Sequence, residues 1–197
     1  DVRCEALREA ISRFEQVNME EILCGNGAAE LFFAAVQAAW PQKALVIAPS
    51  FSEYEEALRS VGAEVEYYYL CEEDNFQIRE DYVDKLSEEI DMIFLCNPNN
   101  PTGQTIDRDM LIKILDRCKK QNIVVILDEC FLEFLDEPNR YEMSDLRGEY
   151  PNLLIIKAFT KIFSMPGLRL GYAISSNQDI LEEMSWKLQQ WNVSVPA

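Results

Sequence analysis

Two cations, Lys161 and Arg169, flank the break at Pro166-Gly167 in the segment FTKIFSMPGLRLGY (residues 159–172). Lys161 follows an apolar run. A lysine amine in a partly desolvated site near other positive charge has a lowered pKa, so more of it is the free amine that attacks a carbonyl carbon. Surface lysines far outnumber catalytic ones, and the residue type alone argues against chemistry. The position of Lys161, with Arg169 directed to the same place, is what favours it.

An acidic pair, Asp128-Glu129, ends the apolar run IVVILDECF. A carboxylate that emerges from such a run is costly unless it meets a cation or a strong hydrogen-bond donor. Solvent exposure or a helix cap is the alternative explanation. Together with the two cations, the pair favours a cationic partner for Asp128.

The segment GNGAAE (residues 25–30) opens directly into a stretch of helix character. Free backbone amides at Gly27, Ala28 and Ala29, together with the helix dipole, suit a phosphate group. An ordinary helix cap explains the same residues equally well. The segment lacks the third glycine of the dinucleotide-binding fingerprint and the G-K-[ST] of a Walker loop.

Two further loops offer groups that orient a ligand. Phe51 follows Pro49-Ser50, where an aromatic side chain could stack on a flat ring, although a lone phenylalanine is more often part of the core. Asn100 lies in NPNNPTG (residues 97–103), a set of turn-forming residues dense enough to hold polar side chains in fixed directions. A plain strand-to-helix loop is the alternative, and the density favours a functional one.

The composition narrows the possible chemistry. The sequence contains no histidine, which excludes Ser-His-Asp and Cys-His catalysis and the usual imidazole zinc sites from this chain, and we expect no metal. Its 35 acidic and 18 basic residues give a formal net charge of −17, which disfavours nucleic acid and anionic membranes as partners. The six cysteines are scattered without a C-x-x-C pair, and no apolar run reaches bilayer length, so we expect a cytoplasmic protein with reduced thiols.

The order of predicted elements shows how these residues could be brought together. Short apolar or β-branched runs predict seven strands, at residues 21–24, 44–48, 65–70, 92–96, 123–127, 153–159 and 170–175. Amphipathic stretches of helix length separate most of them, at residues 29–40, 52–62, 78–90 and 108–121. This alternation predicts one α/β domain over residues 1–197, with a mostly parallel seven-stranded sheet and helices on both faces.

The last two predicted strands are joined by too few residues for a helical crossover, so strand 170–175 should run antiparallel to its neighbour. Lys161 then follows the carboxyl end of one strand, and Arg169 precedes the amino end of the reversed one. Both should lie at the sheet edge where ligands of open α/β sheets bind.

One ligand would use all of these groups. Pyridoxal 5'-phosphate has a phosphate, a flat ring, a ring nitrogen that can be a cation, a ring oxygen and an aldehyde. The corresponding protein groups are, in that order, the Gly27, Ala28 and Ala29 amides with Arg169 and Thr160, then Phe51, Asp128, Asn100 and Lys161.

The ordered motifs GNGAAE, NPNNPTG, LDECF and TKIFSMPGLRLGY resemble those of the class I/II pyridoxal-phosphate-dependent aminotransferase superfamily, of fold type I, over essentially the whole chain. The resemblance implies that Lys161 forms a Schiff base with the cofactor and later moves the Cα proton. It also implies that Asp128 keeps the ring nitrogen protonated and that Asn100 donates to the ring oxygen. Phosphate binding would belong to Arg169, Thr160 and the Ala28 and Ala29 amides.

Within the superfamily, the sequence is most similar to threonine-phosphate decarboxylases and histidinol-phosphate aminotransferases. Phe131 stands where many relatives have a tyrosine that donates to the ring oxygen, and Ala158 stands where many have a phosphate-binding serine. The form of the lysine segment and Phe131 are similar to the decarboxylase branch. We therefore expect a decarboxylase-like enzyme acting on an amino acid, possibly a phosphorylated one. A histidinol-phosphate-type aminotransferase and a non-catalytic cofactor-binding effector domain remain the alternatives.

The resemblance also implies a larger enzyme. Members of this superfamily have an N-terminal arm that reaches across a homodimer interface and a C-terminal small domain that carries a carboxylate-binding arginine. Residues 1–197 resemble the large, cofactor-binding domain alone. We expect this piece to hold the cofactor weakly and to turn over poorly.

Overall fold

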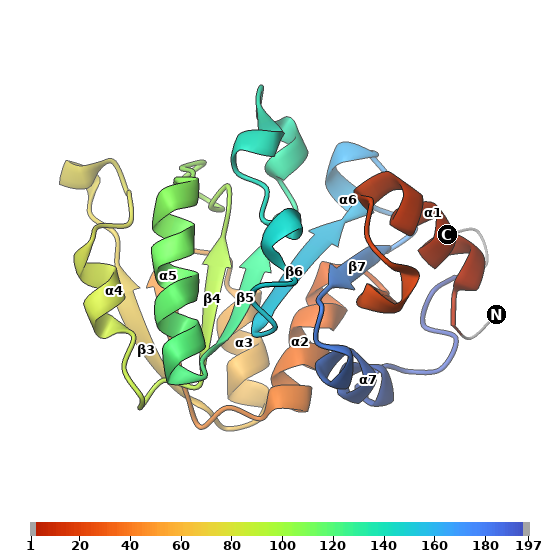
Figure 1. Cartoon of the computed structure of the whole chain (residues 1–197), viewed down its shortest axis with the longest axis horizontal. Coiled ribbons are helices and arrows are strands. Elements are labelled where there is room, and N and C mark those ends of the chain that lie inside the picture. The colour runs from red at the N-terminus through yellow and green to blue at the C-terminus, as the bar shows by residue number, and fades with distance from the viewer. Residues whose placement is uncertain (1–2, 195–197) are drawn as a thin grey trace.

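The apolar runs pair into one seven-stranded sheet in the order β1-β7-β6-β5-β4-β2-β3 (Figure 1). The computed structural model describes residues 3–194. The strands are β1 Ile22–Gly25, β2 Lys43–Ala48, β3 Glu64–Tyr69, β4 Met92–Cys96, β5 Val124–Asp128, β6 Leu153–Ala158 and β7 Gly171–Ile174. Each of the seven predicted strands is present, with no boundary shifted by more than one residue.

Strand direction follows the prediction from loop length. Strands β2 to β6 pair in parallel, whereas β7 runs antiparallel to both β6 and β1. In this register Gly171 of β7 lies opposite Ala158 at the end of β6 and opposite Gly25 at the end of β1. The carboxyl ends of the parallel strands and the beginning of β7 therefore share one edge of the sheet.

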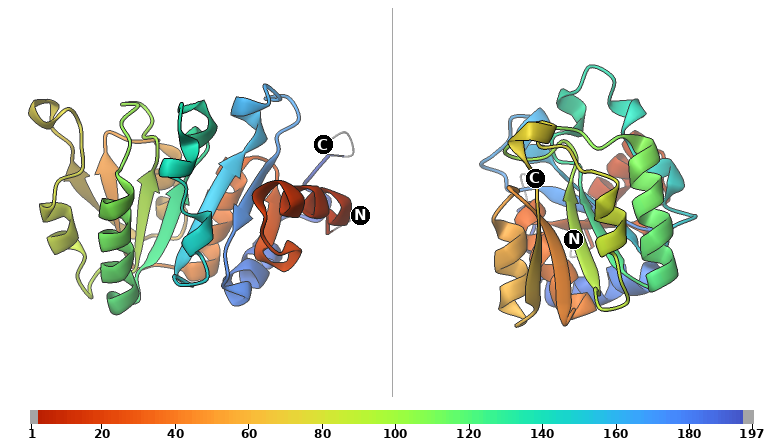
Figure 2. Two further views of the ribbon diagram at one scale, coloured as in Figure 1. Left: turned by 45° about the horizontal axis from the view of Figure 1, so that its top comes forward. Right: turned by 90° about the vertical axis from the view of Figure 1, so that its left-hand side faces the viewer.

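Helices cover both faces of the sheet, as predicted (Figure 2). One face is covered by α2 Ala28–Ala39, α3 Glu53–Ser60 and α7 Gln178–Lys187, and the other by α1 Glu5–Glu15, α4 Asp81–Lys85 and α5 Arg108–Gln121. Alternate strand residues face the two layers, because successive side chains of a strand point to opposite sides. The short helix α6, Phe159–Ile162, lies at the carboxyl edge.

Single turns of 3-10 helix occur in the connections, at Met19–Glu21, Glu72–Asp74, Leu132–Phe134, Pro138–Arg140 and Ser144–Leu146. The predicted helical stretch 78–90 forms a helix only over Asp81–Lys85, because the backbone leaves the helical conformation at Leu86 (φ −81°, ψ 83°). All six cysteines are unpaired. Within residues 3–194, every helix is too short or too polar to cross a bilayer.

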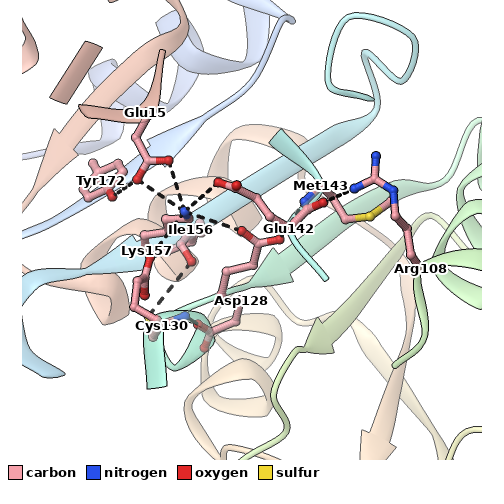
Figure 3. A network of polar contacts seen from close by, with 11 residues as sticks. Glu15, Arg108, Asp128, Cys130, Glu142, Met143, Ile156, Lys157 and Tyr172 are labelled. Carbon is pink, nitrogen blue, oxygen red and sulfur yellow. Dashed lines mark hydrogen bonds and ion pairs between the residues drawn. The ribbon is translucent and has the colours of Figure 1, made fainter. Parts of the chain in front are cut away.

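A cluster of buried charged side chains lies near the carboxyl ends of β5 and β6 (Figure 3). Lys157 of β6 is 4% exposed, and its Nζ atom is within 4 Å of a carboxylate oxygen of four glutamates. We call this group the Lys157 cluster; it consists of Lys157, Glu15, Glu129, Glu133 and Glu142. Burial alone would lower the pKa of Lys157, but the carboxylates raise it above its ordinary value. The lysine is therefore charged and holds the cluster together.

Glu129 is fully buried, with 0% of its surface exposed. Burial raises the pKa of Glu129 to about 8, with Lys157 opposing the shift, so Glu129 holds its proton to higher pH than an ordinary glutamate does. Its Oε2 atom lies 3.8 Å from Lys157 Nζ and has no hydrogen-bond partner among the described residues.

This raised pKa predicts an unusual pH dependence of stability. Between the ordinary glutamate pKa of 4.5 and about 8, the folded chain holds a proton on Glu129 that the unfolded chain releases. The free energy of unfolding should therefore fall as pH rises through this window, with a slope of up to about 1.4 kcal/mol per pH unit from this residue. Glu129→Gln should remove that contribution, so the stability of the variant should rise relative to wild type from pH 5 to pH 8.

Denaturant titrations at several pH values measure this effect. Glu88→Gln, which changes an exposed glutamate, is the matched control and should leave the pH profile unchanged. Parallel profiles for Glu129→Gln and wild type would contradict the assignment.

Candidate active site

The residues singled out from the sequence lie along the carboxyl edge of the sheet, where the arrows of β4, β5 and β6 point in Figure 1. Gly27, Ala28 and Ala29 begin α2, Phe51 follows β2, and Asn100 follows β4. Asp128 ends β5, Thr160 and Lys161 belong to α6, and Arg169 precedes β7. The antiparallel turn of β7 is what brings Arg169 to this edge.

Asp128 is buried, with 5% of its surface exposed. The Tyr54 hydroxyl donates to Oδ2 at 2.5 Å, and the Cys130 backbone N–H donates to Oδ1 at 2.9 Å. Burial raises the pKa of Asp128, and the hydrogen bonds from Cys130 and Tyr54 and the charge of Lys161 partly offset that rise. A cation close to this buried carboxyl group would stabilise its anionic form. Asp128 is therefore a suitable partner for a protonated ring nitrogen.

Tyr54 is a site residue that the sequence reasoning missed. Its side chain is fully buried, and its ring stacks on Phe94 with centroids 4.8 Å apart and meets Phe32 edge-on at 5.0 Å. Phe51 packs edge-on against Tyr54 at 5.6 Å. The aromatic packing therefore fixes both the hydroxyl that holds Asp128 and the half-buried ring of Phe51 beside it.

Two buried asparagines hold the NPNNPTG loop in place. The Asn97 backbone N–H donates to the Asp128 carbonyl at 2.8 Å, which ties the loop to the end of β5. Asn99 accepts a hydrogen bond from the Ser50 hydroxyl at 3.0 Å and donates to the Pro49 carbonyl at 3.1 Å, which ties it to the loop after β2. Asn99 therefore joins the NPNNPTG loop to the loop after β2. Asn100, the next residue, is half-buried.

The beginning of α2 and Arg169 form a corner suited to an anion. Gly27, the residue that caps α2, has φ of +89°, and a Cβ atom built on it would lie 2.9 Å from Arg169 Nη2. A Cβ on Gly171 would lie 2.7 Å from the Ala28 nitrogen. These glycines let the guanidinium group and β7 lie against the first turn of α2, whose amides have no partner within the helix.

Lys161 is exposed on α6, and its Nζ atom lies 5.2 Å from the centroid of the Phe131 ring. It is close enough to Asp128 for its charge to act on that carboxyl group. The Phe159 N–H donates to the Leu170 carbonyl at 3.0 Å, so the start of α6 is paired with the residue after Arg169. Phe131 therefore places an apolar ring beside the amine, where a tyrosine would bring a hydroxyl group.

The predicted residues thus form two groups along the edge. Asp128, Phe51 and Lys161 gather around Tyr54 and Phe131, and Gly27 meets Arg169 at the start of α2. Within residues 3–194, the side chains of Asn100, Thr160 and Lys161 form no hydrogen bond with the other predicted residues. A flat molecule with a phosphate at one end and a protonatable nitrogen at the other fits this combination of an anion corner, an aromatic ring and a buried carboxylate.

Comparison with known proteins agrees with this chemistry. Residues 2–197 match the family described as aminotransferase class I and II. The chain is 36% identical over 191 residues to the threonine-phosphate decarboxylase of Salmonella typhimurium, covering 97% of this chain and 52% of that enzyme. It is 35% identical to the histidinol-phosphate aminotransferase of Ruminiclostridium cellulolyticum, covering 87% of this chain and 48% of that enzyme.

A solved structure shows the same fold. The crystal structure of histidinol-phosphate aminotransferase from Clostridium acetobutylicum superposes with a TM-score of 0.89 at 33% identity, covering 98% of this chain and 56% of that chain. The chain therefore spans about half the length of the relatives it matches.

Proposed function

Because this chain belongs to the aminotransferase class I and II family, whose members depend on pyridoxal phosphate, we propose that it binds this cofactor and serves an enzyme of amino-acid metabolism. We further propose that the enzyme is similar to threonine-phosphate decarboxylase and that its substrate is an amino acid. A phosphorylated amino acid is the favoured substrate. The observation that carries the proposal is the buried Asp128 carboxyl group, held by Tyr54 and within reach of the charge of Lys161.

When bound, the cofactor would supply an electron-withdrawing ring that stabilises negative charge at the substrate Cα atom. Asp128 would hold the proton on the ring nitrogen, and Tyr54 would keep its carboxyl group in position. Lys161 would bond to the cofactor aldehyde and afterwards hold or move the proton at Cα. These roles need a carboxylate and an amine at opposite ends of one small ring.

The remaining residues would orient the cofactor. Arg169, Thr160 and the first amides of α2 would hold the phosphate by charge and hydrogen bonding. Phe51 would stack on the ring, and Asn100 would donate to the ring oxygen. The corner between Gly27 and Arg169 supports the phosphate assignment, because a side chain on Gly27 would fill it.

Phe131 is the feature that favours the decarboxylase branch. Its ring faces the Lys161 amine, so the ring oxygen of a bound cofactor would have one donor fewer than in relatives with tyrosine here. The similarity to a histidinol-phosphate aminotransferase structure supports amino transfer as the second candidate. We propose that the chain is the cofactor-binding large domain of a cytoplasmic homodimer. The match to about half the length of the relatives supports the domain assignment.

Two experiments test the proposal. The chain mixed with pyridoxal phosphate should develop the absorbance of a lysine-bound cofactor, and borohydride reduction should fix the cofactor to the chain. The full-length protein incubated with threonine phosphate should release carbon dioxide. Conversion of the cofactor to its pyridoxamine form by glutamate, without release of carbon dioxide, would instead identify an aminotransferase.

A single methyl group should disturb the phosphate corner. Gly27→Ala places Cβ against Arg169 Nη2 and strains a backbone with φ of +89°. Losing one charge-assisted hydrogen bond costs roughly 1.5–3 kcal/mol, so the affinity for pyridoxal phosphate should fall about tenfold or more. Absorbance titration with the cofactor measures the change.

Gly148→Ala is the matched control, because a Cβ at Gly148 meets no atom within 4 Å. Its affinity should equal that of wild type. An unchanged affinity in Gly27→Ala would place the phosphate elsewhere.

A further inference from the structure

The Lys157 cluster lies next to both candidate catalytic residues along the chain but on the other side of the sheet. Glu129 immediately follows Asp128, and Lys157 lies in the strand that leads into α6 and Lys161. The Glu129 backbone N–H donates to the Ile156 carbonyl at 2.9 Å, which joins the ends of β5 and β6. The cluster is therefore attached to the two strand ends that carry Asp128 and Lys161.

The glutamates of the cluster come from separate segments. Glu15 is the last residue of α1, and its side chain is 2% exposed. Its carboxylate lies 3.1 Å from Lys157 Nζ and accepts a hydrogen bond from the Tyr172 hydroxyl of β7 (Figure 3). Burial and the charge of Glu15 raise the pKa of Tyr172, so this hydroxyl keeps its proton and continues to donate. The end of α1 is thus bound to β6 and β7 at once.

A second set of contacts joins α1 to α6 directly. Phe14 meets Phe163 edge-on, with ring centroids 6.1 Å apart. Phe163 stacks on Phe159 at 5.0 Å, and Phe159 packs on Tyr172 at 5.4 Å. This row of aromatic rings ends at the same tyrosine that donates to Glu15. The charged and the aromatic contacts therefore both connect α1 to the segment that holds Lys161.

Helix α6 depends on such contacts for its position. It has only four residues, and so short a helix has no stability of its own in water. Phe159 at its start is half-buried, whereas Lys161 and Phe163 are exposed. The packing of its aromatic residues against β7 and α1 is what fixes its direction.

We propose that the C-terminal end of α1 positions the lysine helix, with Glu15 acting through Lys157 and Tyr172, and Phe14 acting through Phe163. Glu15 and Phe14 are then positioning residues that set where the Lys161 amine lies relative to Asp128. The role of Lys161 in this inference rests on the proposed function. The mechanical link between α1 and α6 does not, and it can be measured without cofactor.

The first test measures hydrogen exchange in the cofactor-free chain. Glu15→Gln keeps the shape of the side chain and removes its charge, while Lys157 keeps its other carboxylate neighbours. Backbone amides of residues 159–170 should then exchange about tenfold faster than in wild type, as measured by mass spectrometry, with the central strands β4 and β5 unchanged. Glu9→Gln, which alters an exposed glutamate of the same helix, is the matched control and should exchange like wild type.

Phe14→Ala is a second variant for the case in which Glu15→Gln fails to fold. Phe14 is 61% exposed, so its removal leaves the buried charges intact while breaking the contact with Phe163. It should also speed exchange in residues 159–170. Unchanged exchange there in a folded variant would overturn the proposal, as would faster exchange spread evenly over the whole chain.

The second test measures Lys161 itself. The absorbance of lysine-bound pyridoxal phosphate changes with pH, and the midpoint of this change should shift by roughly half a unit in Glu15→Gln, because the amine moves relative to Asp128. Faster exchange without a shifted midpoint would overturn the positioning of Lys161. If the wild-type chain bound no cofactor, the proposed function would fail, and the exchange experiment alone would decide the link between α1 and α6.

Discussion

Lys161→Ala should abolish covalent attachment of pyridoxal phosphate to this chain and lower the turnover of the full-length protein by a factor on the order of 10⁴. Under the proposed function, the variant would lose both the amine that bonds to the cofactor aldehyde and the group that moves the proton at the substrate Cα atom. Borohydride reduction followed by peptide mapping measures the first loss. Steady-state kinetics with threonine phosphate measures the second.

The size of this effect follows from the neighbourhood of Lys161. Phe131 offers an apolar ring face to the Lys161 amine, and this ring can neither bond to an aldehyde nor move a proton. Lys120→Ala, which removes an exposed lysine of α5, is the matched control and should be labelled at Lys161 like wild type. A borohydride-fixed label on any other lysine of the chain would defeat the assignment of Lys161.

The sheet could be predicted from the sequence because its strands are apolar in both layers. Runs such as Met92–Cys96 are completely buried, and a fully buried strand appears in the sequence as an uninterrupted apolar stretch. The direction of β7 followed from chain length alone, since the residues between β6 and β7 are too few for a crossover. The edge that gathers the polar motifs followed from these two facts.

Tyr54 and Asn99 could not be predicted in the same way. Tyr54 lies 74 positions before Asp128 in the sequence, and nothing near either residue indicates that they meet. From the sequence pattern of α3, Tyr54 is indistinguishable from an ordinary buried residue of an amphipathic helix. The role of Asn99 could not be predicted because it lies in a loop rich in turn-forming residues. Its contacts with Ser50 and Pro49 distinguish it from Asn100.

The Lys157 cluster could not be predicted from the sequence for a related reason. Lys157 lies within an apolar strand, and its partner Glu15 is 142 positions away at the end of a helix. A lone charge in an apolar run signals that a partner exists, because an unpaired buried charge is costly, but it does not say where the partner is. The acidic pair Asp128-Glu129 likewise implied a partner without indicating which residue it is. Strand alternation then sends its two carboxylates to opposite sides of the sheet, one to the candidate site and the other to the cluster.

Asp128→Asn should lower turnover by about 10²–10⁴-fold while leaving Lys161 able to bond to the cofactor. A neutral amide would not hold the ring nitrogen of a bound cofactor in its protonated state, so the ring would withdraw electrons less strongly from the substrate Cα atom. The variant should still be labelled at Lys161 after borohydride reduction, which separates the loss of chemistry from the loss of attachment. Its turnover falls for an electrostatic reason, and the fold should survive because the side chain keeps its shape.

Tyr54→Phe should give a graded version of the same defect. Removing the hydroxyl takes away the donor 2.5 Å from Oδ2 of Asp128, which raises the pKa of that carboxyl group further and weakens its hold on the ring proton. A hydrogen bond to a charged group contributes roughly 1.5–3 kcal/mol, so turnover should fall about tenfold to a hundredfold, with full labelling of Lys161. Tyr150→Phe is a close control, because the Tyr150 hydroxyl also donates to an aspartate, Asp116 of α5, at 2.9 Å, and Tyr150 precedes the amino end of β6 rather than its carboxyl end. Equal turnover losses in the two tyrosine variants would mean that Tyr54 acts only through stability, and the role of Asp128 as the partner of the ring nitrogen would then lose its support.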